Sequence, residues 1–305
     1  QTIRADAPDI LIDLAGHTGM TNRLSLFAKH LAPVQINYLG YPNTTGVSAV
    51  GYRFTDAIAD PPGEADAFAT EQLVRFAPTA WTYQAPDCFP DVKPAPCTTA
   101  PDAPVTFGCF NNLAKVTDRM LRVWAQLLAT VPNSRLLLKG RGLGEEAVRQ
   151  RYHARFAAAG LPAERVDLLE RTAETVDHLA LYHRVDVALD TFPYHGTTTT
   201  CEALWMGCPV VALMGDRHAA RVSGSLLKAI GRDEWIANSE KDYIALAAAL
   251  AADRGRLAEI RAGLRDEMRA SVLMDHAGQA ERFGAALRQC WMNWCDSRVS
   301  VAAGA

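Results

Sequence analysis

A regular alternation between residues 105 and 214 constrains the fold most. Short apolar runs alternate there with amphipathic segments of helical spacing, and the connections between them are short. This alternation is typical of a parallel, doubly wound α/β sheet. The expected strands are 105–110, 135–138, 166–169, 185–189 and 210–214, and the expected helices are 117–130, 144–159, 174–184 and 197–206.

The rest of the chain predicts a second, smaller lobe and a connection to it. Residues 1–76 contain three strand-like apolar runs, 8–15, 34–39 and 52–58. A doubly wound lobe usually needs ~100 residues or more, so we expect this N-terminal catalytic lobe to be incomplete, with only its C-terminal part present.

Residues 77–104 hold seven of the 16 prolines and predict a Pro-rich linker, because proline fits neither a helix interior nor a central strand. Residues 105–270 then form the second lobe. Amphipathic helical segments are expected over 240–270 and 275–294, and we expect the tail 271–305 to return toward the first lobe.

Composition excludes several classes of protein. The net charge of -3 favours neither nucleic acid nor an anionic membrane as a partner. No apolar run reaches the length of a membrane span, and no signal peptide is visible. Seven cysteines without a CxxC pair indicate a reducing compartment, so we expect a cytoplasmic protein without structural zinc.

The strongest functional motif follows the predicted strand 185–189. It reads Asp-Thr-Phe-Pro-Tyr-His-Gly-Thr-Thr-Thr-Thr-Cys-Glu-Ala-Leu-Trp, so a turn with Gly196 leads into four threonines that open a helix. The first N–H groups of a helix have no intrahelical partner and attract phosphate, and the threonine hydroxyls add donors. Four threonines exceed what a helix cap alone requires. Glu202, in the first turns, can accept hydrogen bonds from ribose hydroxyls.

Two further motifs also follow predicted strands. Phe-Asn-Asn-Leu-Ala-Lys, at 110–115, ends in Lys115, whose charge suits a diphosphate. Parallel strands end at one edge of a sheet, so this loop and the threonine turn should converge. In the first lobe, Gly16 precedes His17, a donor for a phosphate or a sugar. Taken alone, Lys115 is better explained as a solvated loop lysine, and His17 fits a structural role equally well.

Other polar segments carry weaker signals. His178, near the start of a predicted helix, can stack on a base. The segment 139–142 follows a strand, but its glycines match neither a Walker nor a dinucleotide fingerprint. The cluster 216–221 fits a helix cap equally well. No HExxH or GxSxG motif occurs, so we do not expect metal-dependent or serine hydrolysis.

Five blocks in order resemble the protein O-GlcNAc transferase family, particularly its bacterial members. They lie at 13–18, 39–46, 110–115, 190–205 and 215–222, and the resemblance covers about 8–295. It implies a GT-B fold with two doubly wound lobes. It also implies an inverting, metal-independent and cofactor-free enzyme that transfers N-acetylglucosamine from UDP-GlcNAc to Ser or Thr of acceptor proteins, with tetratricopeptide repeats upstream.

The resemblance also assigns roles to single residues. Lys115 would contact the diphosphate, His178 would stack near the uracil, and Glu202 would hold the ribose. His17 joins Lys115 as a candidate catalytic residue. The remaining donor-binding candidates are Asn112, Gly196, Thr198 and Thr199.

The chain departs from animal members at two positions: Thr197 replaces a histidine before the paired threonines, and Thr175 replaces a lysine of the uracil loop. Three alternatives stay open. The donor can be a GDP-sugar, as in SPINDLY-like O-fucosyl transfer. The acceptor can be Asn, as in N-glucosyl transfer. The chain can also be a non-catalytic nucleotide-sugar-binding fragment.

Overall fold

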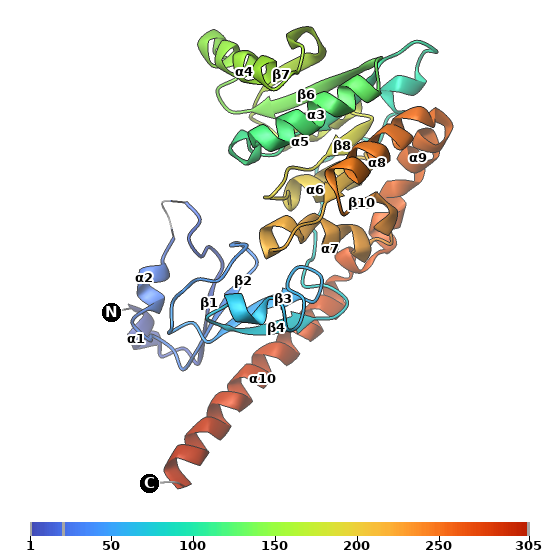
Figure 1. The fold of residues 1–305 in the computed structure, drawn as a ribbon. Coiled ribbons are helices and arrows are strands. Elements are labelled where there is room, and N and C mark those ends of the chain that lie inside the picture. The colour runs from blue at the N-terminus through green and yellow to red at the C-terminus, as the bar shows by residue number, and fades with distance from the viewer. Residues whose placement is uncertain (1, 20–21, 304–305) are drawn as a thin grey trace. The chain divides into compact units, whose positions relative to one another are not determined.

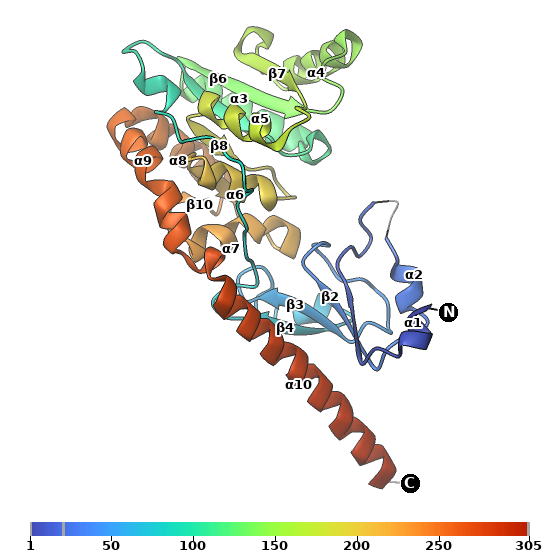
Figure 2. The same ribbon diagram turned by 180° about the vertical axis from the view of Figure 1, so that it is seen from behind.

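The computed structural model describes residues 2–19 and 22–303, which form two compact units (Figures 1 and 2). The first unit contains the described residues of Gln1–Thr82, Arg217–Ala219 and Asp275–Ala305. The second unit contains Tyr83–Asp216 and Ala220–Met274. Both units are built on sheets whose strands all run parallel.

The sheet of the second unit has six strands in the order β10-β9-β8-β5-β6-β7. From β5 the chain moves outward to β6 and β7, and it then crosses back to β8 on the other side of β5. The strands β5 and β8 therefore flank the point where the strand order reverses, which is where open α/β sheets bind ligands. The strands are β5 (Val105–Cys109), β6 (Ser134–Gly140), β7 (Val166–Glu170), β8 (Val187–Leu189), β9 (Val210–Leu213) and β10 (Ile236–Ala237).

Helices cover both faces of this sheet. Figures 1 and 2 show α3 and α8 on one face and α5 and α6 on the other. The core beneath α3 contains the fully buried side chains of Phe107, Leu136 and Trp124. The helices are α3 (Asp118–Thr130), α4 (Glu146–Ala158), α5 (Thr175–Ala180), α6 (Thr198–Trp205), α7 (Val222–Ala229), α8 (Glu240–Ala252) and α9 (Arg254–Ala270).

The sequence prediction for this unit is confirmed in its architecture and corrected in two places. The stretch 240–270 is two helices, because Asp253 leaves the helical conformation and its carboxylate Oδ1 accepts a hydrogen bond from the Arg256 N–H at 2.8 Å, which caps α9. The two-residue strand β10 was not predicted, because it is too short to produce an apolar run.

The proline-rich segment after Tyr83 packs on the second unit. It contains neither an α-helix nor a strand, only a 3₁₀ turn at 96–98. Two arginines of α9 hold its backbone: Arg261 donates to the Lys93 carbonyl at 2.9 Å, and Arg265 donates to the Pro90 carbonyl at 2.9 Å. The Asp186 carboxylate accepts the Cys97 N–H at 2.9 Å. The segment thus takes its conformation from side chains elsewhere in the unit.

The first unit has a four-stranded parallel sheet in the order β1-β2-β3-β4. The prediction of three strands was wrong, because polar Gln72 and Arg75 hide the apolar pattern of β4. The elements are α1 (Thr2–Asp6), β1 (Ile10–Asp13), α2 (Leu24–Phe27), β2 (Val34–Tyr38), β3 (Tyr52–Asp56), β4 (Gln72–Phe76) and α10 (His276–Ala303).

The C-terminal helix α10 packs against the core of this sheet. The ring of Phe283 lies 5.4 Å from that of Tyr38, 5.7 Å from that of Phe54 and 6.4 Å from that of Phe76, measured between centroids. About two helical turns further along α10, Cys290 is buried in the same core. None of the helices in the described part of the chain is long and apolar enough to cross a membrane.

We predict that Phe283→Ala destabilises the first unit. A fully buried Phe→Ala change costs roughly 3–5 kcal/mol, and because Phe283 is half-buried we expect a loss of about 2 kcal/mol. Urea unfolding followed by circular dichroism measures this loss. Glu281→Ala, an exposed change on the same helix, is the control and should leave the midpoint unchanged. Equal midpoints for both variants would show that α10 does not stabilise this sheet.

Candidate functional site

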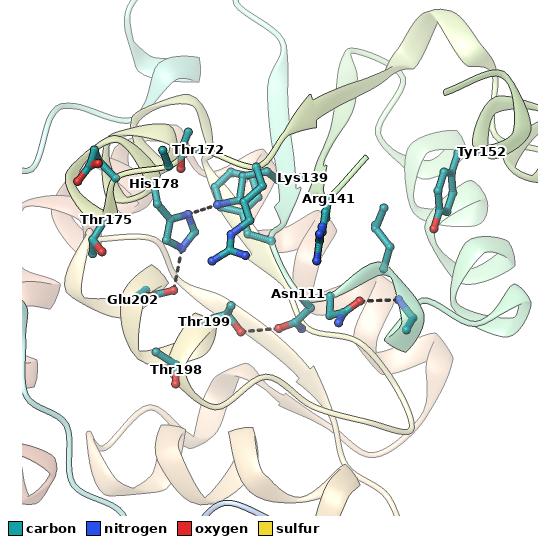
Figure 3. Close-up of a pocket in the computed structure, with 18 residues that line it drawn as sticks. Asn111, Lys139, Arg141, Tyr152, Thr172, Thr175, His178, Thr198, Thr199 and Glu202 are labelled. Carbon is teal, nitrogen blue, oxygen red and sulfur yellow. Dashed lines mark hydrogen bonds and ion pairs between the residues drawn. The ribbon is translucent and has the colours of Figure 1, made fainter. Parts of the chain in front are cut away.

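A pocket of about 710 Å³ lies in the second unit, at the edge of the sheet where β5, β6 and β7 end (Figure 3). Ligand sites commonly measure ~300–1,000 Å³. The lining residues come from the loops after these strands, from α5 and from the first turns of α6. They include Phe110, Asn111, Asn112, Lys139, Arg141, Arg171, Thr172, Thr175, His178, Thr198, Thr199 and Glu202.

The Asp190 carboxylate, directly after β8, ties the loops around the switch point together. Its Oδ1 accepts hydrogen bonds from the Asn111 side chain at 2.8 Å and from the backbone N–H groups of Thr191 at 2.9 Å and Gly196 at 2.8 Å. Asp190 is 2% exposed, so these donors replace the water that would otherwise solvate Oδ1. The two motifs therefore converge, as the sequence predicts.

Gly196 has to be glycine for steric reasons. A Cβ at this position would lie 2.5 Å from the Thr199 hydroxyl oxygen and 2.8 Å from the Asn111 Oδ1. Its N–H donates to Asp190, and Gly196 itself is not one of the lining residues of the pocket. Next to it, the Thr199 hydroxyl donates to Asn111 Oδ1, which fixes the start of α6 against the loop after β5. Thr198 and Thr199 both line the pocket, on the first turn of the helix (Figure 3).

Three side chains form a hydrogen-bonded chain across the pocket, with His178 between Lys139 and Glu202 (Figure 3). The Lys139 ammonium group contacts Nδ1 of His178. The Nε2 of His178 lies 2.9 Å from Glu202 Oε2. The Phe110 ring closes this end of the pocket, 6.0 Å from the His178 ring between centroids. An imidazole held in this way offers a flat face to a base, and Glu202 Oε1 remains to accept from a ribose hydroxyl.

The pocket lining carries more cations than carboxylates. Lys139, Arg141 and Arg171 line it, and so do Glu174 and Glu202. Burial lowers the pKa of Lys139 to about 8; the Glu202 carboxylate acts in the opposite direction, and the Arg171 guanidinium adds to the lowering. This arrangement suits a ligand that carries anionic phosphates.

Lys115 lies beside the pocket, in the 3₁₀ turn 113–115, and is not one of its lining residues. Its ammonium group donates to the His195 carbonyl at 2.7 Å and lies 3.8 Å from the centre of the Tyr194 ring. Burial lowers the pKa of Lys115, and the nearby Asp190 carboxylate partly opposes this. The ammonium has three N–H groups, and the bond to His195 uses one of them.

Asn112 lines the pocket but its side-chain oxygen is engaged locally. Its Oδ1 accepts the Ala114 N–H at 3.0 Å and so caps the turn that carries Lys115. Asn112 therefore both lines the pocket and stabilises the turn that carries Lys115.

His17 belongs to the first unit, where it is exposed at the end of β1. Its Nε2 donates to the Thr45 carbonyl at 2.8 Å, and its ring meets the Tyr41 ring edge-on at 5.1 Å. The preceding Gly16 has φ +52°, and a Cβ there would lie 2.3 Å from the Tyr41 Cβ. The loops 13–18 and 39–46 thus form one packed structure, in which Nδ1 of His17 keeps its lone pair.

Sequence reasoning gave little weight to Lys139 and Arg141. Their segment was set aside because its glycines match no known fingerprint, whereas in the structure Lys139, Gly140 and Arg141 all line the pocket. The signal that could have found them is their position at the carboxyl end of a strand of the same sheet. Within residues 2–19 and 22–303, no group of three or more His, Cys, Asp or Glu side chains is arranged to hold a metal ion.

The chain is similar to several known proteins over nearly its whole length. The model of glycosyl transferase family 41 matches residues 1–93 and 96–282. The probable UDP-N-acetylglucosamine–peptide N-acetylglucosaminyltransferase SPINDLY of Petunia hybrida is 44% identical over 298 residues, which are 97% of this chain and 31% of the relative. Its Arabidopsis thaliana counterpart is 42% identical over 305 residues, covering 97% and 32%.

A solved structure agrees with these relatives. A mutant of Thermobaculum terrenum O-GlcNAc transferase matches with a TM-score of 0.89 and 38% identity, over 97% of this chain and 55% of that chain. The chain spans about a third of the length of the curated relatives that it matches.

We predict that Asn111→Ala destabilises the second unit by about 1.5–3 kcal/mol, the range for a hydrogen bond to a charged group. The change removes one of the donors to the buried Asp190 carboxylate and frees the Thr199 hydroxyl. The free energy of unfolding in urea measures it. Asn133→Ala is the matched control, because that exposed amide bonds only a backbone carbonyl. An equal loss for the two variants would contradict the role of Asp190.

Proposed function

Because the chain belongs to glycosyl transferase family 41, we propose that it is the donor-binding region of a protein O-GlcNAc transferase. The whole protein transfers N-acetylglucosamine from UDP-GlcNAc to serine and threonine hydroxyls of acceptor proteins. The observation that carries this proposal is the pocket at the switch point, which combines a helix start, three cations and two carboxylates.

Each part of a UDP-sugar has a matching group in this proposal. The diphosphate lies against the first turn of α6, where the Thr198 hydroxyl and the backbone N–H groups of Thr198 and Thr199 supply donors. The ribose hydroxyls donate to Glu202. The uracil stacks on His178, whose ring orientation is fixed at both nitrogens. The names of the relatives support UDP-GlcNAc as the donor.

The reaction is a single displacement with inversion at the anomeric carbon. The acceptor hydroxyl oxygen forms the new bond to that carbon as the bond to the β-phosphate oxygen breaks, so negative charge develops on UDP. Lys115 and the start of α6 stabilise this leaving group. The acceptor hydroxyl releases its proton to water, and we assign His17 as the second catalytic residue because its Nδ1 lone pair can interact with a sugar hydroxyl.

The proposal includes neither a metal ion nor another cofactor, since cationic side chains and helix N–H groups supply the positive charge. The first unit is assigned to the C-terminal part of an N-terminal catalytic lobe, and tetratricopeptide repeats are expected upstream. A cytoplasmic location fits the buried thiols, which are free.

A donor panel tests the function. The whole protein and an acceptor protein are incubated with UDP-GlcNAc, UDP-glucose or GDP-fucose in the presence of EDTA, and nucleotide release is measured. We expect UDP release from UDP-GlcNAc and none from GDP-fucose. Release from GDP-fucose would establish the O-fucosyl alternative, and transfer to Asn the N-glucosyl alternative. No release with any donor would favour a non-catalytic fragment, and activity that requires manganese would overturn the metal-independent mechanism.

We predict that UDP binds the present chain and that Lys115→Ala weakens this binding by about 1.5–3 kcal/mol, through loss of a charge-assisted hydrogen bond to the diphosphate. Isothermal titration calorimetry measures both affinities. Lys241→Ala, which removes an exposed lysine at the start of α8, is the control and should bind UDP normally. Unchanged affinity in Lys115→Ala would remove Lys115 from the donor site.

A further inference from the structure

Lys139 occupies an unusual place for a lysine. It is the second-last residue of β6 and is 7% exposed, although lysine is almost never buried without a partner. Its polar partner is not a carboxylate but the Nδ1 atom of His178. The Phe110 ring lies on another side of the ammonium group, 5.4 Å away at its centroid. A buried cation therefore faces an imidazole and an aromatic ring.

This contact determines where the imidazole carries its proton. An ammonium group has only N–H donors, so Nδ1 of His178 must present its lone pair. The proton of the neutral ring is then on Nε2, and Nε2 donates to Glu202 Oε2 at 2.9 Å. A proton on Nδ1 would place an imidazole N–H donor against the N–H donors of the Lys139 ammonium group. A doubly protonated ring would place two cations in contact.

We propose that Lys139 is a positioning residue of the donor pocket: it holds His178 as the neutral Nε2–H tautomer and so orients Glu202. The proposal rests on the proposed function, because it takes the occupant of the pocket to be a nucleoside diphosphate. Glu202 Oε2 is engaged by His178, so Oε1 is directed to the ribose. Lys139 acts through His178 and needs no contact with the donor.

The charges around Lys139 make this arrangement sensitive to pH. Glu202 on α6 favours the ammonium form, Arg171 after β7 opposes it, and burial opposes it most, so its pKa is about 8. The other ionisable groups that line the pocket are His178 on α5, Glu174 directly before α5, Arg141 after β6 and Tyr152 on α4. Below about pH 8 the ammonium group is present. As the pH rises above 8, its charge and the preference for one tautomer are lost.

The first test is spectroscopic and does not depend on catalysis. In the 305-residue chain, long-range ¹H–¹⁵N correlation spectra of the His178 ring report which nitrogen carries the proton. We expect Nε2–H in the wild-type chain near pH 7, and an added population with Nδ1–H in Lys139→Met. A wild-type ring protonated on Nδ1 overturns the proposal, and so does a variant with the wild-type tautomer.

The second test is calorimetric, with UDP as the probe. We expect Lys139→Met to bind UDP about tenfold more weakly at pH 7, equivalent to one hydrogen bond. Wild-type affinity should fall as the pH rises through about 8, whereas Lys139→Met should show no such fall. Lys139→Arg keeps its charge, so it should retain affinity at high pH. Lys241→Met, an exposed change, should follow the wild-type pH profile.

The outcomes separate this proposal from the proposed function. If the wild-type chain does not bind UDP, the proposed function fails, while the tautomer measurement still decides the role of Lys139. If UDP binds and its pH profile is the same in Lys139→Met, the positioning role is refuted. A loss of UDP affinity with an unchanged His178 tautomer would make Lys139 a direct ligand, which also refutes it.

Discussion

The burial of the Asp190 carboxylate is the constraint on which the pocket of the second unit depends. A buried carboxylate without donors would be very unfavourable, so the loops that follow β5 and β8 must bring N–H groups to it. Asn111 comes from one loop and Gly196 from the other, and their bonds to a single oxygen hold the loops together. The start of α6 follows from this arrangement, because Thr199 then bonds the same Asn111 side chain.

The architecture was predictable because parallel strands are buried on both faces and appear as continuous apolar runs. The runs around Phe107, Leu137 and Val211 are of this kind. The same principle explains what was missed. β4, at the edge of its sheet, carries Gln72 and Arg75 and has no such run. The break at Asp253 was missed although Asp is a preferred N-cap residue and Gly255 follows two positions later, because the apolar residues continue on both sides of it.

The candidate site could be predicted in part. Asn112, Thr198 and Glu202 lie in motifs whose residue types already suggest phosphate and ribose, and these do line one pocket. The direction of a side chain depends on distant neighbours and was not predictable: Lys115 bonds the His195 carbonyl rather than lining the pocket. The contact that distinguishes Lys139 is with His178, which lies 39 positions further along the chain, so the local sequence could not predict it.

The two arginines of α9 have a consequence for dissecting the protein. Arg261 is 2% exposed and donates to the carbonyls of Lys93, Val185 and Tyr182, so the proline-rich segment supplies part of the shell around a buried cation. Excising the second unit at the first residue of β5 would leave that guanidinium underbonded and open to water. A fragment meant to fold by itself should therefore begin at Tyr83, and the proline-rich segment is better regarded as a structural strap than as a tether.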